Sequence, residues 1–337
     1  MTVSTEPAAP PQTRRRQRAP DFFIVGHAKC GTTALYEMLR GHPQIFMPDY
    51  KAGAGKEPWY FSRSNPQPQT SSERSIAFTG RYPMTFEEYL SLFKDAREDQ
   101  RIGEASTSYL WSPTAAAAIA AAQPAARIIA ILREPASFLR SLHLQLLQNH
   151  HEIEKDFRKA LALDDDRRAG RNIPKLSYWP SALIYSDRVR YVEQLRRYHA
   201  AFSPEQVLVL IYDDFQQDNE GTVRRVLRFL EVDDGAPIGV VAANPTVRLR
   251  SERVRDLMRS TRRGRNPLAQ AVRAGGKAIV PQQVRHGVER RLVYGSPRPP
   301  DEGLMLELRR RYKGEVVAAS EYLGRDLVTL WGYDEIE

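Results

Sequence analysis

A glycine-bounded segment near the amino terminus has the residue types of an anion-binding loop. Residues 26–33 read GHAKCGTT, follow the apolar run DFFIV, and precede ALYEMLR, in which apolar residues recur at helical spacing. A loop between a buried strand and a helix start points backbone N–H groups inward, and the helix dipole adds positive potential. The segment therefore predicts a phosphate-binding loop. The alternative interpretation is an ordinary glycine turn with a surface lysine.

The position of the lysine separates this loop from the loop of ordinary nucleoside-triphosphate enzymes. Their pattern is GxxxxGK[ST], in which the lysine follows the second glycine. Gly26 and Gly31 fit that pattern, but Thr32 stands where the lysine belongs, and Lys29 lies inside the loop instead. The spacing therefore argues against a loop built for the phosphates of ATP.

A second feature keeps an ATP-dependent kinase as an alternative function. The apolar run VLVLIY is followed by Asp213 and Asp214, which resembles the strand and aspartate that hold magnesium in such enzymes. Buried strands commonly end in acidic turn residues, so this match is weak. Together with the displaced lysine, it leaves the kinase as the less favoured interpretation.

A second candidate phosphate site lies further along the chain. The buried run RIIAIL is followed directly by Arg133, and Ser141 comes eight residues later within the helical pattern ASFLRSLHLQLLQ. An arginine at the carboxyl end of a strand and a hydroxyl two turns into the next helix can converge on one phosphate. The sequence therefore predicts two phosphate sites at one edge of a sheet.

The elements that must position these residues alternate between strand and helix. Buried strands are predicted at residues 21–25, 127–132 and 207–212, and helices at residues 85–94, 113–123, 136–148, 182–202, 221–231 and 301–323. This alternation predicts an α/β fold, with a P-loop-like central parallel sheet flanked by helices. We expect a flexible arm over residues 1–20 and a single domain over residues 21–337.

Composition narrows the class of protein further. The chain has 337 residues, of which 42% are hydrophobic and 27% charged, as in ordinary globular proteins. It has neither an apolar run of the roughly 20 residues that span a membrane nor a secretory leader pattern. Its single cysteine, Cys30, excludes an internal disulfide. We therefore expect a cytoplasmic location, and the spacing of His, Cys and acidic residues predicts no metal site.

Positive charge is concentrated in one segment. The net charge is +9, and residues 248–313 alone carry 18 basic and 6 acidic residues. Such a segment attracts an acidic acceptor, nucleic acid, or a membrane surface on which a lipid-linked acceptor sits. An anion-binding or nucleic-acid-binding module is thus a further alternative. Nucleic acid is not favoured, because aromatic residues are sparse across residues 248–290.

The displaced-lysine loop and the Arg133–Ser141 pair resemble the sulfotransferases that use 3′-phosphoadenosine 5′-phosphosulfate (PAPS). The resemblance implies that a sulfuryl group is transferred in line, and that adenosine 3′,5′-bisphosphate (PAP) is the product. It implies that Lys29 assists catalysis at the oxygen bridging phosphate and sulfate. The donor-binding residues that it implies are Lys29, Cys30, Gly31, Thr32 and Thr33 at the 5′ end, and Arg133 and Ser141 at the 3′-phosphate.

A third segment narrows the resemblance to the heparan-sulfate-type branch. Residues 56–61 read KEPWYF, which resembles the K-E-x-x-F/Y-F stretch whose glutamate is the catalytic base in that branch. The resemblance therefore implies that Glu57 is the base, whereas the alternative is a surface carboxylate. The steroid and phenol enzymes instead use a histidine after the third strand, but residues 103–109, GEASTSY, contain none. Ala105 stands where the heparan sulfate enzymes often carry a lysine.

The resemblance implies an acceptor hydroxyl or amine on a sugar, a glycolipid or a natural product. The absence of the usual disulfide of the branch suits a bacterial, cytoplasmic relative. Tyr178 and Trp179, in the stretch NIPKLSYWP, are expected either to form an acceptor wall or to pack in the core. His27 is expected to pack within the loop, and His143 is one of the histidines that could face the acceptor.

Overall fold

The computed structural model describes residues 18–49, 56–63, 85–175, 177, 179–239, 248–249, 294–295 and 299–337. Most of the predicted amino-terminal arm and of the basic segment 248–313 therefore lies outside the described residues. Arg18 is the first residue described, and its guanidinium donates to the backbone oxygen atoms of Arg97, Glu98 and Gln100. Among the described residues, no helix is both long and apolar enough to cross a bilayer.

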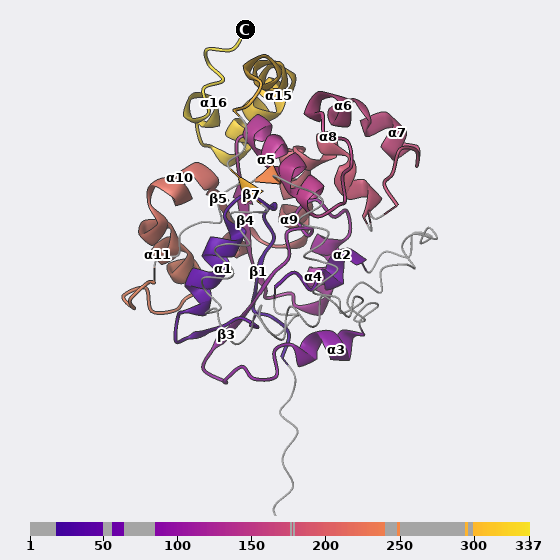
Figure 1. Ribbon diagram of the computed structural model, residues 1–337. Coiled ribbons are helices and arrows are strands. Elements are labelled where there is room, and N and C mark those ends of the chain that lie inside the picture. The colour runs from indigo at the N-terminus through magenta and orange to yellow at the C-terminus, as the bar shows by residue number, and fades with distance from the viewer. Residues whose placement is uncertain are drawn as a thin grey trace, which may run out of the picture.

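A five-stranded parallel sheet forms the centre of the molecule (Figure 1). Its strands, in spatial order, are β2 (Ile45–Phe46), β3 (Arg101–Ala105), β1 (Phe22–Ile24), β4 (Arg127–Leu132) and β5 (Val207–Ile211). Strand β1 lies in the middle, with Ile24 opposite Ala105 of β3 and Ile129 of β4. The predicted α/β class and parallel sheet are confirmed.

Helices cover both faces of this sheet (Figure 1). Helix α1 packs against α11 on one side, and α4 packs against α9 on the other. The remaining long helices, α5 and α15, pack against each other. Within the described ranges, the helices longer than one turn are α1 (Thr32–Arg40), α3 (Phe86–Ser91), α4 (Ala115–Ala122), α5 (Pro135–Gln148), α6 (Phe157–Ala162), α7 (Asp164–Arg168), α9 (Tyr191–Ala201), α10 (Tyr212–Gln217), α11 (Asn219–Phe229) and α15 (Glu302–Leu323).

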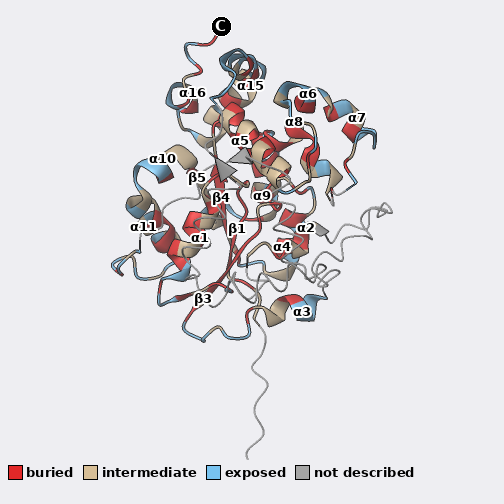
Figure 2. Cartoon of the chain, in the orientation of Figure 1, coloured by how far each residue is buried: buried red, intermediate tan, exposed pale blue. Residues whose placement is uncertain are grey.

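The strands have continuous apolar sequences because both of their faces are buried. All three residues of β1 are buried, and so are residues 128–132 of β4 (Figure 2). A parallel sheet with helices on both sides needs apolar residues at successive positions rather than at alternate ones. This is why RIIAIL forms a strand with the predicted bounds. Strand β5 ends one residue earlier than predicted, because Tyr212 begins α10.

The prediction of one long helix over residues 182–202 is wrong. The segment contains a 3₁₀ turn (Pro180–Leu183), a short helix α8 (Tyr185–Arg188) and then α9. The Asp164 carboxylate accepts hydrogen bonds from the backbone N–H groups of Tyr185 and Ser186, which fixes a separate start for α8. The break before α9 is stabilised by Gln194, whose Nε2 donates to the carbonyl of Asp187 over 2.9 Å. Long-range hydrogen bonds thus override the helical periodicity.

The two aspartates that resembled a magnesium site instead hold the carboxyl-terminal segment. Asp213 accepts a hydrogen bond of 3.0 Å from Nε1 of Trp331, which follows the short helix α16 (Leu327–Leu330). Asp214 forms an ion pair with both terminal nitrogen atoms of Arg325. Both carboxylates therefore have structural partners, which removes the observation that kept a kinase as an alternative.

Replacing Gly103 by alanine should destabilise the sheet. A Cβ atom at Gly103 of β3 would lie 2.2 Å from Cζ of Phe22 on the neighbouring strand. Both residues are in the core, so overpacking should lower the free energy of unfolding by about 1–3 kcal/mol. Urea denaturation measures this change. The matched control is Gly314→Ala in α15, where nothing lies within 4 Å of the new Cβ and stability should rise by up to about 1 kcal/mol. Equal stability of the two variants would contradict the prediction.

Candidate active site

The predicted phosphate loop joins β1 to α1 at the carboxyl edge of the sheet. Gly31 caps α1 with a φ of 83°, in the left-handed region that favours glycine. A side chain there would also collide with the ring of Phe215, 2.9 Å from the position of a Cβ. Lys29 has a φ of 68°, so the backbone turns sharply at both residues. Strand, loop and helix thus follow one another as the sequence predicts.

Two of the predicted cationic residues meet at this loop. Nη1 of Arg133 donates to the backbone oxygen of Lys29 over 2.9 Å, and the guanidinium lies 4.6 Å from the ring centroid of Tyr212. Burial, followed by the charge of Arg133, lowers the pKa of Lys29. Among the described residues, no carboxylate pairs with either cation. Their charges are therefore available to an anion at the loop.

Cys30 is the point on which the positive charges converge. Burial raises the pKa of its thiol to about 12, although Arg133, Arg188 and Lys29 each act to lower it. The thiol is therefore neutral at physiological pH, and it supplies no counter-charge to the three cations. The sequence analysis missed Arg188, because nothing in the charged stretch SDRVR distinguishes it from a surface arginine.

Ser141, the predicted partner of Arg133, is buried two turns into α5. The backbone N–H groups of Ala136 and Ser137 at the start of this helix are bonded by the side chain of Glu134. Burial and the charge of Arg133 also lower the pKa of Arg140, the residue before Ser141. A second positive region thus lies where the 3′-phosphate site is predicted, and the convergence of Arg133 and Ser141 on one phosphate stays a prediction.

Glu57, the predicted base, is fixed at the carboxyl end of β3. Its Oε2 accepts three hydrogen bonds: 2.8 Å from Nε1 of Trp59, 2.8 Å from the backbone N–H of Thr107, and 3.0 Å from the Thr107 hydroxyl. Its Oε1 forms an ion pair of 2.6 Å with Lys56. The backbone N–H of Glu57 donates to the carbonyl of Ala105. Oε1 is therefore the oxygen with capacity for a further proton.

A second carboxylate lies beneath this segment. Glu104 is fully buried and accepts hydrogen bonds from the hydroxyl groups of Tyr89, Tyr109 and Ser106. The Ser106 hydroxyl accepts in turn from the backbone N–H of Trp59. Burial raises the pKa of Glu104 to about 7. The sequence analysis assigned Glu104 no role, and the structure shows that its network supports the backbone beside Glu57.

Three tryptophan side chains form a half-buried cluster beside Glu57. The ring of Trp179 lies 6.1 Å from that of Trp59 and 5.1 Å from that of Trp111, both in edge-on contacts. Trp59 is also the residue whose indole N–H bonds Glu57. We call Trp59, Trp111 and Trp179 the tryptophan wall. Of the two residues predicted as an acceptor wall, Trp179 lies in it, and Tyr178 lies outside the described residues.

Two of the histidines named in the sequence analysis, His27 and His143, make packing contacts. Nε2 of His27 bonds the side-chain oxygen of Gln194 over 2.8 Å, and burial lowers its pKa well below the usual value. Nδ1 of His143 lies 2.8 Å from the Tyr185 hydroxyl, and its ring stacks on Phe157. Both rings are buried in structural contacts, which is consistent with the expectation that His27 packs within the loop.

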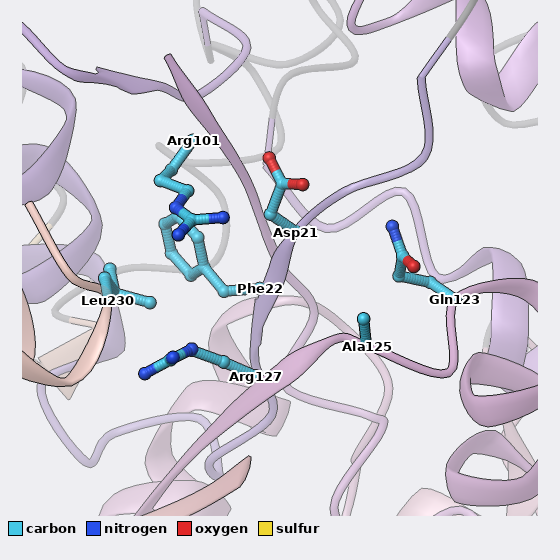
Figure 3. A pocket seen from close by; sticks show the side chains of 7 residues that line it. All are labelled: Asp21, Phe22, Arg101, Gln123, Ala125, Arg127 and Leu230. Carbon is cyan, nitrogen blue, oxygen red and sulfur yellow. The ribbon is translucent and has the colours of Figure 1, made fainter. Parts of the chain in front are cut away.

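A small cavity at the opposite edge of the sheet is a separate feature (Figure 3). Arg101 and Arg127, the first residues of β3 and β4, line it, and both form ion pairs with Glu231. Ligands of parallel α/β sheets bind at the carboxyl ends of the strands. This cavity lies at the amino ends, and its arginines already have a carboxylate partner, so it is not the candidate site.

A parallel α/β sheet with a glycine-bounded loop between its central strand and the following helix is typical of the nucleotide-binding class of proteins. The sequence model of the sulfotransferase family matches residues 20–235, more than half of the chain. The chain therefore belongs to the sulfotransferase family, and the resemblance found from its motifs is confirmed at that level. A crystal structure of a sulfotransferase from Alicyclobacillus acidocaldarius is 25% identical, with a TM-score of 0.64, and covers 93% of this chain and 99% of that one.

Curated relatives are similar over parts of their length. Human carbohydrate sulfotransferase 15 is 27% identical over 262 residues, which cover 63% of this chain and 44% of that protein. Human heparan sulfate glucosamine 3-O-sulfotransferase 6 is 31% identical over 132 residues, which cover 39% of this chain and 32% of that protein. The chain thus spans less than half the length of these relatives.

The stability of the protein should depend on pH through Glu104. Its folded-state pKa of about 7 lies above the ordinary value of 4.5, so protonation favours the folded state. Its contribution is complete below about pH 4.5 and is lost as the pH rises through 7. From pH 5 to pH 8, the unfolding free energy of the wild type should fall by about 2.5 kcal/mol relative to Glu104→Gln.

Urea titrations at a series of pH values measure this difference. Glu98→Gln, at an exposed position, is the matched control and should follow the wild type. Parallel stability curves for the wild type and Glu104→Gln would show that Glu104 does not titrate differently in the folded state.

Proposed function

We propose that this protein transfers a sulfuryl group from PAPS to a hydroxyl or amine of an acceptor, with Glu57 as the general base. The observation that carries the proposal is that cations without a carboxylate partner in the described ranges lie at the loop, on the same sheet edge as a fixed carboxylate. Lys29 follows β1, Arg133 follows β4, and Glu57 is pinned to the end of β3. The carboxyl ends of neighbouring parallel strands lie together, so these groups share one site.

The donor side of this site suits a ligand with several negative charges. The backbone N–H groups of residues 30–33 would hold the 5′-phosphate at the start of α1. Arg133 and Ser141 would hold the 3′-phosphate, which is the group that distinguishes PAPS from the simpler adenosine phosphosulfate. Because no carboxylate neutralises Lys29 among the described residues, its positive charge can act on the leaving group.

The chemical step requires a base on one side of the sulfur and a cation on the other. The acceptor oxygen or nitrogen forms a bond to sulfur, while the bond from sulfur to the bridging oxygen breaks. Oε1 of Glu57 takes the acceptor's proton, because Oε2 is already occupied by three donors. Lys29 stabilises the negative charge left on the phosphate. Positioning and charge stabilisation supply most of the catalysis, as in phosphoryl transfer.

The acceptor side is lined by aromatic rings. The tryptophan wall adjoins Glu57 through the Trp59 indole, and apolar faces with a few placed polar groups are typical of small-molecule sites. Two relatives carry carbohydrate acceptors in their names, which supports a sugar acceptor here. A lipid-linked acceptor, contact of residues 248–313 with a membrane surface, a cytoplasmic location and a bacterial origin stay predictions.

The donor assignment predicts which nucleotide stabilises the protein. PAP without metal should raise the melting temperature, because it binds the folded state only. At a concentration 100 times its Kd it would add about 2.7 kcal/mol to the unfolding free energy. Thermal unfolding with PAP, with ATP and magnesium, and with buffer alone measures this. Stabilisation by ATP and magnesium but not by PAP would overturn the donor assignment and restore the kinase.

Glu57→Gln should abolish most of the turnover without affecting nucleotide binding. Glutamine keeps the shape of the side chain but cannot take a proton, so kcat should fall about 10²- to 10⁴-fold. Single-turnover assays with PAPS measure the chemical step, and PAP binding by calorimetry checks that the donor site is intact. Glu98→Gln serves as the control for a distant carboxylate. Wild-type turnover by Glu57→Gln would mean that another group is the base.

A further inference from the structure

Arg188 is a buried cation that has no carboxylate partner within the part of the chain that the structure describes. Arg188 is the last residue of α8, and the residue is 3% exposed. Among the described residues, no carboxylate pairs with its guanidinium, and its buried Nε has no hydrogen-bond partner. Burial lowers its pKa to about 9, so it still carries a charge at neutral pH. Nearby Asp187 is bonded to Arg168 instead.

An unpaired buried charge is unfavourable for folding and is rare unless it serves a ligand. Removing a guanidinium from water costs several kcal/mol, and a carboxylate or phosphate normally offsets that cost. The guanidinium carbon lies 4.2 Å from the ring centroid of Trp111, and the electron-rich face of that ring attracts the positive charge. A ring face does not accept hydrogen bonds from N–H groups that lie in the guanidinium plane, however. The N–H groups of Arg188 that could bind an oxyanion are therefore left without an acceptor among the described residues.

The surroundings of Arg188 place it between the two halves of the active site. Its charge acts on the pKa values of Cys30 and His27, two residues of the phosphate loop. Gln194 ties the backbone of Arg188 to that loop, because its amide nitrogen donates to the Arg188 carbonyl and its oxygen bonds His27. On its other side, Arg188 contacts the tryptophan wall through Trp111.

We propose that Arg188 is an oxyanion-binding residue of this active site, donating hydrogen bonds to a sulfonate or carboxylate group held between the phosphate loop and the tryptophan wall. The proposal rests on the proposed function, because it assumes that donor and acceptor meet there. The oxyanion has two sources: the sulfuryl group of the donor, or an acidic substituent of the acceptor.

The experiment compares the wild type with Arg188→Met, which keeps much of the volume and removes the charge. The measurements are ligand-free thermal stability and the affinities for PAP, PAPS, and two sugars in the presence of PAP. The sugars are 4-nitrophenyl glucuronide and 4-nitrophenyl glucoside, which differ in one carboxylate. Arg190→Met is the matched control, because Arg190 is exposed and pairs with Glu193.

We expect ligand-free Arg188→Met to be at least as stable as the wild type, because an unpaired buried charge has been removed. If the sulfuryl group is the oxyanion, PAPS affinity should fall about tenfold or more while PAP affinity is unchanged. If the acceptor supplies it, glucuronide affinity should fall by as much while glucoside affinity is unchanged. Arg188→Lys, which keeps the charge but not the planar fork, should show a smaller loss of the same affinity.

Three results would overturn the proposal. The first is unchanged affinity of Arg188→Met for every probe. The second is an equal loss for PAP and PAPS, which would show that Arg188 only supports the loop. The third is a large loss of ligand-free stability, or failure of Arg188→Met to fold, together with wild-type affinities in Arg188→Lys. Failure of the proposed function is distinguishable, because the wild type itself would then bind neither PAP nor PAPS.

Discussion

Repulsion between positive charges that have no carboxylate partner among the described residues, at one end of a parallel sheet, is the constraint on which the proposed site depends. Lys29, Arg133 and Arg188 all act electrostatically on Cys30, and burial removes much of the water that would screen them. Such an arrangement costs stability in the ligand-free protein, and the extensive apolar core around β1 and β4 offsets it. In the proposed function a polyanionic donor would remove this repulsion, so the charges that weaken the fold would be the ones that bind the substrate.

Glu57, the proposed base, is held in place by different interactions from the cations. Glu57 has a hydrogen-bond donor for each of its oxygen atoms, and its own backbone N–H is bonded to the end of β3. Its orientation is therefore set before any acceptor binds. The Glu104 network holds the adjacent backbone through Ser106, so the carboxylate is supported by a second layer of polar contacts. Glu57 thus has Lys56 as its counter-charge, whereas no carboxylate among the described residues pairs with Lys29 or Arg133.

What could be predicted from the sequence was the part encoded locally. The loop at residues 26–33, the strand before Arg133 and the KEPWYF segment each lie within a short stretch whose pattern carries its own structure. The break within residues 182–202 was not predictable in this way, because the hydrogen bonds that cause it come from Asp164 and Gln194. Arg188 was missed for the same reason, since its burial depends on Trp111 and on the loop.

The carboxyl-terminal segment also supports the proposed donor site, through contacts that no local pattern shows. Arg325 and Trp331 hold the two aspartates at the start of α10. The rings of Tyr212 and Phe215, from the same helix, lie against Gly31, and Arg133 stacks on Tyr212.

Movement of α10 would therefore shift the rings of Tyr212 and Phe215 that pack behind Gly31. It would also shift the Tyr212 ring on which the Arg133 guanidinium stacks. The aspartates that resembled a metal site thus act on the proposed active site indirectly, because they fix the helix whose Tyr212 ring supports Arg133.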